Sequence, residues 1–298
     1  MIKAVGLTKK FGAFTALDAL HTEIDRGRVY GLVGPNGSGK STFLRSIAGI
    51  YRPDAGTLTV DGHAVFDTPA VKDRIFLLAE DLFFLPKSTV DDMAAFYAGL
   101  YSGFSRERYQ QLKARFPIRT DRRISTFSKG MKRQAALLLA LASGTDYLLL
   151  DEAFDGLDPV VRLLMKKLFA EQVAERGVTV IITGHNLREL EDFCDQIGLL
   201  HQGKILFQKE LDALKLDFCK VQAAFETPVD WGAAGLEILQ KREQGKYVSL
   251  LVRGSGEDTM RRIAQLNPLF SEAIPLTLEE VFIGEMEAAG YDYNHFSL

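Results

Sequence analysis

One stretch of the 298-residue chain predicts the fold, and it reads Gly34-Pro35-Asn36-Gly37-Ser38-Gly39-Lys40-Ser41-Thr42. Its spacing is that of G-x-x-x-x-G-K-[ST], a loop that wraps the phosphates of a nucleotide when it lies between a strand and a helix. The apolar run 29–33 before it predicts a buried strand, and residues 42–49 after it predict a helix. The sequence therefore predicts an α/β fold with a phosphate-binding loop.

The residue types of this loop suit an anionic ligand. Gly34, Gly37 and Gly39 can take backbone conformations that other residues avoid, so that N–H groups converge on phosphate oxygens at a helix N-terminus. Lys40 is expected to reach the β- and γ-phosphates, and the Ser41 hydroxyl to ligate Mg²⁺. A glycine-rich turn with a chance lysine is the alternative, and the flanking strand and helix weigh against it.

The composition is that of a globular protein. With 47% hydrophobic residues, the chain can bury a sizeable core. Its net charge of −3 shows no excess of basic residues and so gives no sign of a nucleic-acid partner. Two cysteines predict no disulfide framework. No signal-peptide pattern is present, and the longest apolar run, 135–142, is far shorter than the ~18 residues that cross a bilayer. We expect a chain that is soluble by itself and needs a partner for any membrane role.

A second apolar run, residues 147–150, ends in Asp151 and Glu152. This pattern predicts a buried parallel strand that delivers carboxylates to the sheet edge where ligands of α/β folds bind. We expect Asp151 to hold Mg²⁺ through its water shell and Glu152 to polarise the water that attacks the γ-phosphate. A solvated strand cap is the alternative, which the phosphate-binding loop upstream disfavours.

Two further polar residues belong to the next helix and strand. Asp158, followed by proline, is a good helix N-cap. The β-branched run 178–183 predicts a strand, which leads to His185. Because this strand end would share an edge with Lys40 and Glu152, His185 is a candidate for contacting the γ-phosphate.

The segment from about 81 to 145 reads mainly as helix. Residues 89–92 have a capping-box pattern, and helices are expected at 93–101, 106–116 and 132–142. Ser128 is expected to cap the last of these, and a capped helix start beside Gly130 is a potential anion site. Beyond residue 216, strands at 220–225 and 247–252 and helices at 257–265 and 281–289 predict a small α+β appendage. The sequence therefore predicts two domains, residues 1–215 and 216–298. The appendage is expected to serve in dimer contact or regulation, and a structural lid on the core is the alternative.

These motifs, in this order, resemble the ATP-binding subunit of ABC transporters over about residues 1–210. The resemblance implies a P-loop NTPase (RecA-like) core with a mainly helical ABC subdomain, and ATP and Mg²⁺ as cofactors. Residues 34–42 match its Walker A motif, and Asp151 and Glu152 match the Walker B aspartate and the catalytic glutamate. The resemblance also assigns Phe11 to adenine stacking, Asp158 to the D-loop and His185 to the switch histidine.

The resemblance carries implications for partners. Family members dimerise around two ATP molecules, each phosphate-binding loop facing the other subunit's signature motif, so Ser128 and Gly130 are expected to act on the partner's ATP. A homodimer on the inner face of the cell membrane with a separate permease is implied. A soluble ABC ATPase without a membrane partner is the alternative, and the single cassette and lack of heptads count against it. Glu152 and His185 count against a module that binds ATP without hydrolysing it.

This chain departs from the family pattern at two places. The signature reads Phe127-Ser128-Lys129-Gly130-Met131 where the family usually has Leu-Ser-Gly-Gly-Gln. It resembles variants of the exporter-like ABC-2 branch, which favours export. Glu80 stands where the family often has a glutamine, and its carboxylate can still ligate Mg²⁺ while adding negative charge near Asp151. The apolar run 82–86 that follows either lines a groove for a permease helix or packs inside the helical subdomain.

Overall fold

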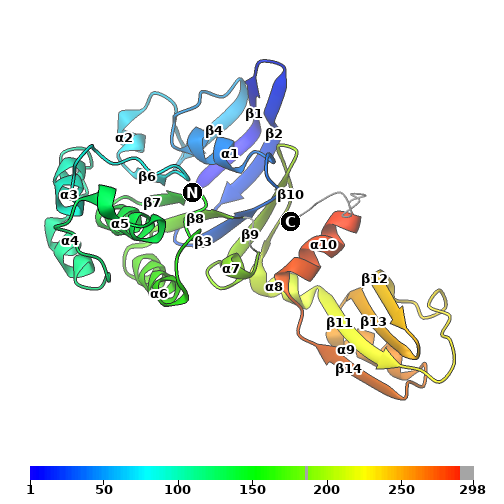
Figure 1. Ribbon diagram of the computed structural model, residues 1–298. Coiled ribbons are helices and arrows are strands. Elements are labelled where there is room, and N and C mark those ends of the chain that lie inside the picture. Colours follow the sequence, from blue (N-terminus) through cyan, green and yellow to red (C-terminus); the bar gives the residue numbers. More distant parts are fainter. Residues whose placement is uncertain (185–186, 289–298) are drawn as a thin grey trace. The chain divides into compact units, whose positions relative to one another are not determined.

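The computed structural model describes residues 1–184 and 187–288 (Figure 1). Contacts divide the chain into two units, Met1–Gln208 and Lys209–Leu298, with the division inside strand β10 (Lys204–Glu210). The sequence placed the domain boundary after residue 215. Helix α8 (Leu211–Leu216) belongs to the second unit because it contacts the first strand and the last helix of that unit.

The first unit is built on a six-stranded sheet in the order β10-β9-β3-β8-β7-β6. Five of these strands run parallel, namely β3 (Val29–Val33), β6 (Ile75–Leu78), β7 (Tyr147–Leu150), β8 (Thr179–Gly184) and β9 (Gln196–His201). Every residue of β3 and β7 is buried, as expected for strands covered on both faces. The three strands predicted at the phosphate-binding loop, Asp151 and Gly184 are therefore present, and their carboxyl ends share one edge.

A second, antiparallel sheet in this unit was not predicted. It has the order β2-β1-β4-β5 and comprises β1 (Ile2–Phe11), β2 (Phe14–Ile24), β4 (Ala55–Val60) and β5 (His63–Ala64). One hydrophobic cluster joins Leu7 of β1, Phe43 of α1 (Lys40–Ile47) and Leu149 of β7. The antiparallel sheet therefore fixes α1, and with it the loop at the start of α1, against the parallel sheet.

Helices α3 (Val90–Ala98), α4 (Arg106–Lys113) and α5 (Lys129–Ala142) form a group beside the parallel sheet (Figure 1). The caps predicted for them are present: Thr89 and Asp92 form a capping box, and the Ser128 hydroxyl accepts a hydrogen bond from the Met131 N–H at 3.3 Å. Because each helix begins directly after its predicted cap, α3 and α5 begin three residues earlier than expected. The other helices of this unit are α2 (Pro69–Lys72), α6 (Pro159–Arg176) and α7 (Leu187–Glu191).

The second unit contains one antiparallel sheet in the order β12-β13-β11-β14. Its strands are β11 (Phe218–Ala224), β12 (Glu237–Gln244), β13 (Tyr247–Arg253) and β14 (Phe270–Ile274). Helix α9 (Gly256–Ala264) lies between β13 and β14 in the chain, and α10 (Leu278–Ala288) follows β14. Ile263 of α9 packs against Val221 and Leu250 on one face. The predicted α+β character is present, although β12 and β14 were not predicted.

Candidate nucleotide-binding site

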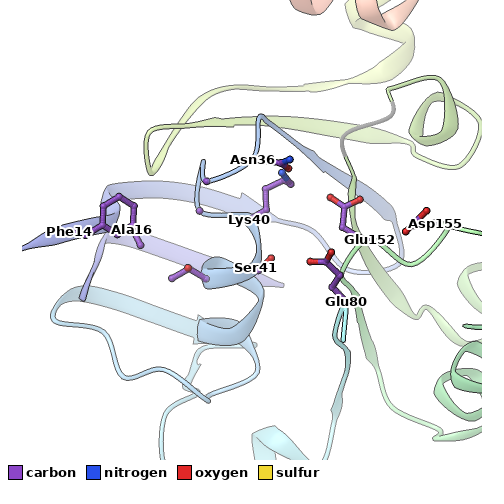
Figure 2. Close-up of a pocket in the computed structure, with 11 residues that line it drawn as sticks. Phe14, Ala16, Asn36, Lys40, Ser41, Glu80, Glu152 and Asp155 are labelled. Atoms are coloured by element: carbon purple, nitrogen blue, oxygen red, sulfur yellow. The ribbon is translucent and has the colours of Figure 1, made fainter. Parts of the chain in front are cut away.

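A cavity of about 500 Å³ lies at the phosphate-binding loop, within the size range of ligand sites (Figure 2). It is lined by Phe14, Ala16, Asn36, Gly37, Gly39, Lys40, Ser41, Thr42, Glu80, Glu152 and Asp155. Eight of these were named from the sequence. The remaining three, Phe14, Ala16 and Asp155, reach the cavity from β2 and from the segment after β7.

At two positions of the loop, Gly34 and Gly39, only glycine fits both the backbone conformation and the available space. Gly34 has φ 157°, and a Cβ there would lie 2.1 Å from the carbonyl oxygen of Leu200. Gly39 has φ 112°, and a Cβ would lie 2.5 Å from the carbonyl oxygen of Ala16. Gly39 is the N-cap of α1 and supplies no side-chain cap, so the first N–H groups of the helix are available to an anion.

Lys40 lies inside the loop. Its ammonium donates hydrogen bonds to the carbonyl oxygens of Gly34 (2.7 Å) and Pro35 (3.2 Å). Burial lowers the pKa of Lys40, and the negative charges of Glu152, Asp151 and Glu80 act in the opposite direction. Figure 2 shows the carboxylates of Glu80 and Glu152 facing Lys40 across the cavity.

The two acids after β7 are oriented by one hydroxyl. Asp151 is 1% exposed, and its Oδ1 accepts a hydrogen bond from Thr183 Oγ1 at 2.6 Å. The Glu152 N–H donates to the same Thr183 Oγ1 at 3.1 Å. Glu152 has φ 49°, a left-handed conformation that costs a non-glycine residue about 1–2 kcal/mol and turns its side chain toward the cavity. Thr183, at the end of β8, was missed from the sequence because its role depends on pairing of β7 with β8.

Several predicted site residues lie outside the cavity lining. Asp158 caps α6, accepting a hydrogen bond from the Val161 N–H at 2.9 Å. Phe11 packs edge-on against Tyr51 with ring centroids 5.2 Å apart, whereas its hairpin partner Phe14 lines the cavity. Six further predicted residues do not line the cavity, namely Gly34, Pro35, Ser38, Ser128, Gly130 and Asp151. The predicted His185 lies outside the described residues.

The signature segment touches the segment after β7 within the same chain. A Cβ on Gly130 would lie 2.7 Å from the carbonyl oxygen of Gly156. The ammonium of Lys129 pairs with Asp155 Oδ2 at 2.5 Å, so this cation is directed toward a carboxylate of its own chain. Both side chains are largely exposed, which limits the energy of the pair.

The sequence model of the ABC transporter family matches residues 17–155. The chain is 32% identical over 285 residues to the ABC transporter ATP-binding protein YtrB of Bacillus subtilis (strain 168), covering 96% of this chain and 98% of the relative. The chain belongs to the family of ABC transporter ATP-binding proteins. Another relative is the linearmycin resistance ATP-binding protein LnrL of the same organism, 31% identical over 212 residues, which are 69% of this chain and 68% of LnrL.

Solved structures of ABC cassettes share the fold of this family member. A structure of the ATP-binding subunit of an ABC transporter has a TM-score of 0.67 and 26% identity, and covers 72% of this chain and 92% of its own. A dimeric post-hydrolysis cassette, MJ0796 with ADP and Pi, has a TM-score of 0.62 and 23% identity, over 71% and 99% of the two chains. The chain is thus an ABC ATPase cassette, and the alternative of a soluble ABC ATPase without a membrane partner is not favoured.

No helix within residues 1–184 and 187–288 is both long enough and apolar enough to span a bilayer.

Proposed function

We propose that two copies of this ABC cassette bind and hydrolyse Mg-ATP at their interface and thereby drive export through a separate membrane permease. The observation that carries the proposal is the cavity in which Lys40 and Ser41 of the loop face Glu80 and Glu152. Phosphoryl transfer requires mainly positioning and charge neutralisation, and this cavity offers the Lys40 cation and several carboxylates for it.

The donor set fits Mg²⁺. Ser41 offers a hydroxyl, and Glu80 and Asp151 offer carboxylates. No group of three or more His, Cys, Asp or Glu side chains within the described residues forms a metal site by itself. This suits Mg²⁺, which in phosphate sites relies on one or two carboxylates, substrate oxygens and water. When bound, the ion would neutralise charge on the β- and γ-phosphates.

Each residue of the site would then have a separate role in the reaction. Lys40 would exchange its two loop carbonyls for phosphate oxygens, which offer it a stronger, charge-assisted hydrogen bond. Glu152, held by Thr183 and its left-handed backbone, would orient and deprotonate the attacking water. Phe11, or Phe14 from the same hairpin, would hold the adenine, and His185 would contact the γ-phosphate.

Dimerisation would complete the site. Ser128 and Gly130 are absent from the lining of their own chain's cavity, yet they stand at the capped start of α5, where an anion is favoured. We propose that they face the ATP of the second copy, with Asp158 at the same interface. Two of the similar solved structures are dimeric cassettes, which supports a dimer of this chain.

Two observations support a membrane partner and export. Phe83, three residues after Glu80, is 70% exposed, which suits a contact with a helix of the permease. Relatives of this chain include LnrL and the bacitracin transport ATP-binding protein BcrA of Bacillus licheniformis, 29% identical over 218 residues, 72% of this chain and 71% of BcrA. The chain would then lie in the cytoplasm, on the inner face of the cell membrane.

The experiment is to tag the chain at its native locus, solubilise membranes in detergent and identify what co-purifies. We expect a stoichiometric multi-span protein and Mg²⁺-dependent ATPase activity of the recovered complex. Recovery of soluble protein alone would contradict the transporter role. A Phe83→Asp variant that still recovers the permease in full would contradict docking at Phe83 and leave the rest of the proposal standing.

A further inference from the structure

Arg133 is buried directly behind the acids of the ATP site. Its side chain is 2% exposed and is the largest of those buried most completely in the described residues. It lies on α5, the helix that Ser128 caps. A buried guanidinium is costly unless its charge and its five N–H donors are satisfied.

The contacts of Arg133 satisfy it only in part. Its Nη1 donates to the carbonyl oxygen of Glu80 at 3.2 Å and lies 3.5 Å from that of Ala79. Its Nε has no hydrogen-bond partner among the residues that the structure describes. Both carbonyls belong to the segment that leaves β6 and carries the Glu80 side chain, so Arg133 holds the backbone of that segment.

The charge of Arg133 is balanced by the same acids that surround Lys40. Burial lowers the pKa of Arg133, and the charges of Asp155, Glu80, Glu152 and Asp151 oppose this, in that order. Three of those carboxylates, Glu80, Asp151 and Glu152, also act on Lys40. The acid cluster, meaning these three residues, therefore has one buried cation from the loop and a second from α5.

We propose that Arg133 is a positioning residue for ATP hydrolysis, which fixes the segment carrying Glu80 and offsets the charge of the acid cluster from behind. The inference rests on the proposed function of the cavity. Without this cation, the carboxylates of Glu80 and Glu152 would face the polyphosphate of ATP, and Asp151 would remain buried outside the cavity lining. Lys40 would then be the single buried counter-charge in the described part of the site. Arg133 also joins the cluster to α5, whose N-terminal Ser128 is proposed to serve the second copy.

The test compares Arg133→Gln with Arg133→Lys, using Lys132→Gln as the control that removes one positive charge from the neighbouring, less buried position. Affinity for trinitrophenyl-ATP is measured in EDTA and in excess Mg²⁺, and kcat and KM for ATP are measured alongside. Glutamine keeps an N–H donor for the Glu80 carbonyl but loses the charge, whereas lysine keeps the charge but loses the planar fork.

We expect Arg133→Gln to weaken binding in EDTA about tenfold, the effect of one charge at ~10 Å and an effective dielectric constant of ~20. In Mg²⁺ the loss should be less than threefold, because the ion itself then neutralises the cluster. Arg133→Lys should bind like the parent in EDTA and lower kcat several-fold at nearly constant KM. Lys132→Gln should match the parent in all four quantities.

A purely structural role would weaken binding equally with and without Mg²⁺, and that outcome overturns the inference, as does parent-like binding in EDTA by a folded Arg133→Gln. If the glutamine variant is not recovered folded, Arg133→Lys decides, and a parent-like kcat overturns the positioning role. Failure of the parent chain to bind the nucleotide in either condition would instead contradict the proposed function.

Discussion

The two units of this chain use β-structure in opposite ways. In the first, buried parallel strands bring the loop after β3 and the acids after β6 and β7 to one edge, where they line one cavity. In the second, all strands are antiparallel, and the cavity at Trp231 and Tyr247 is only about 200 Å³. The family model matches the first unit alone, whereas the similarity to YtrB extends over both.

The difference shows how topology gathers chemistry. Parallel strands must all deliver their carboxyl ends to the same edge, so polar residues far apart in sequence become neighbours there. Antiparallel strands alternate direction and leave no such common edge. The first unit is therefore expected to carry catalysis, and substitutions in the second are expected to change stability with little effect on ATP chemistry.

The largest effect is expected for the proposed base. Glu152→Gln should lower kcat by about 10²–10⁴-fold, the contribution of a general base, while ATP still binds. Glu272→Gln, an exposed carboxylate on β14 of the second unit, is the control and should leave kcat unchanged. Steady-state ATPase assays check both, and a Glu152→Gln variant within tenfold of the parent would make another residue the base.

Glycine at the loop is expected to matter far more than glycine in a hairpin of the second unit. Gly34→Ala places a Cβ 2.1 Å from a carbonyl oxygen, and the forced shift of the loop should weaken ATP binding about 10²-fold. Gly245→Ala has open space and φ 63°, so only the left-handed backbone opposes it, at about 1–2 kcal/mol of stability. Nucleotide titration and thermal unfolding measure the two. Equal affinities of both variants would refute the steric argument.

A core substitution in the second unit should separate folding from ATP binding. Leu250 is 1% exposed, and Leu250→Ala should lower the free energy of unfolding by about 2–5 kcal/mol. Tyr247→Ala on the same strand, 68% exposed in the parent, should cost much less. Trp231, the one tryptophan of the sequence, reports denaturation of this unit by fluorescence. Loss of ATP affinity in Leu250→Ala at temperatures where the unit is folded would show that the units are coupled.

The smallest effect is an electrostatic one at the start of α10. The Glu280 carboxylate pairs with Lys220 and accepts from the Thr277 N–H and hydroxyl, each at 3.1 Å. Burial alone would raise the pKa of Glu280, but these hydrogen bonds outweigh it and lower that pKa. Its stabilisation is therefore complete above the ordinary pKa of 4.5 and is lost as pH falls through the lower folded-state value.

Glu280→Gln, which keeps the capping geometry, should cost about 1 kcal/mol at pH 7. The difference in free energy of unfolding between the variant and the parent should shrink below pH ~4.5, because protonation removes the charge of the parent carboxylate. Urea denaturation followed by Trp231 at several pH values measures this. A difference that stays constant down to pH 3 would contradict a role for the charge.

Local signals in the sequence were sufficient for the loop, the acids and the caps. The spacing of the glycines and Lys40 within residues 34–42 and the apolar run ending in Asp151 are local patterns, and the caps Thr89, Ser128 and Asp158 bond N–H groups three residues away. Strands β12 and β14 escaped prediction because they lie at the sheet edges and lack a clear apolar alternation. Strand β12 ends in four exposed charged or polar residues, and β14 has only five residues, with Phe270 and Ala273 exposed beside Glu272.

The sequence by itself determined the phosphate-binding loop, the order of the motifs and the family, because these depend on residue types at short, fixed spacing. Only the tertiary structure decided that Phe14 rather than Phe11 lines the cavity, that Thr183 hydrogen-bonds both acids, and that Arg133 of α5 donates to the backbone carbonyl of Glu80. Each of these contacts joins elements distant in the chain, and which elements meet is set by strand order and packing, which no local pattern encodes.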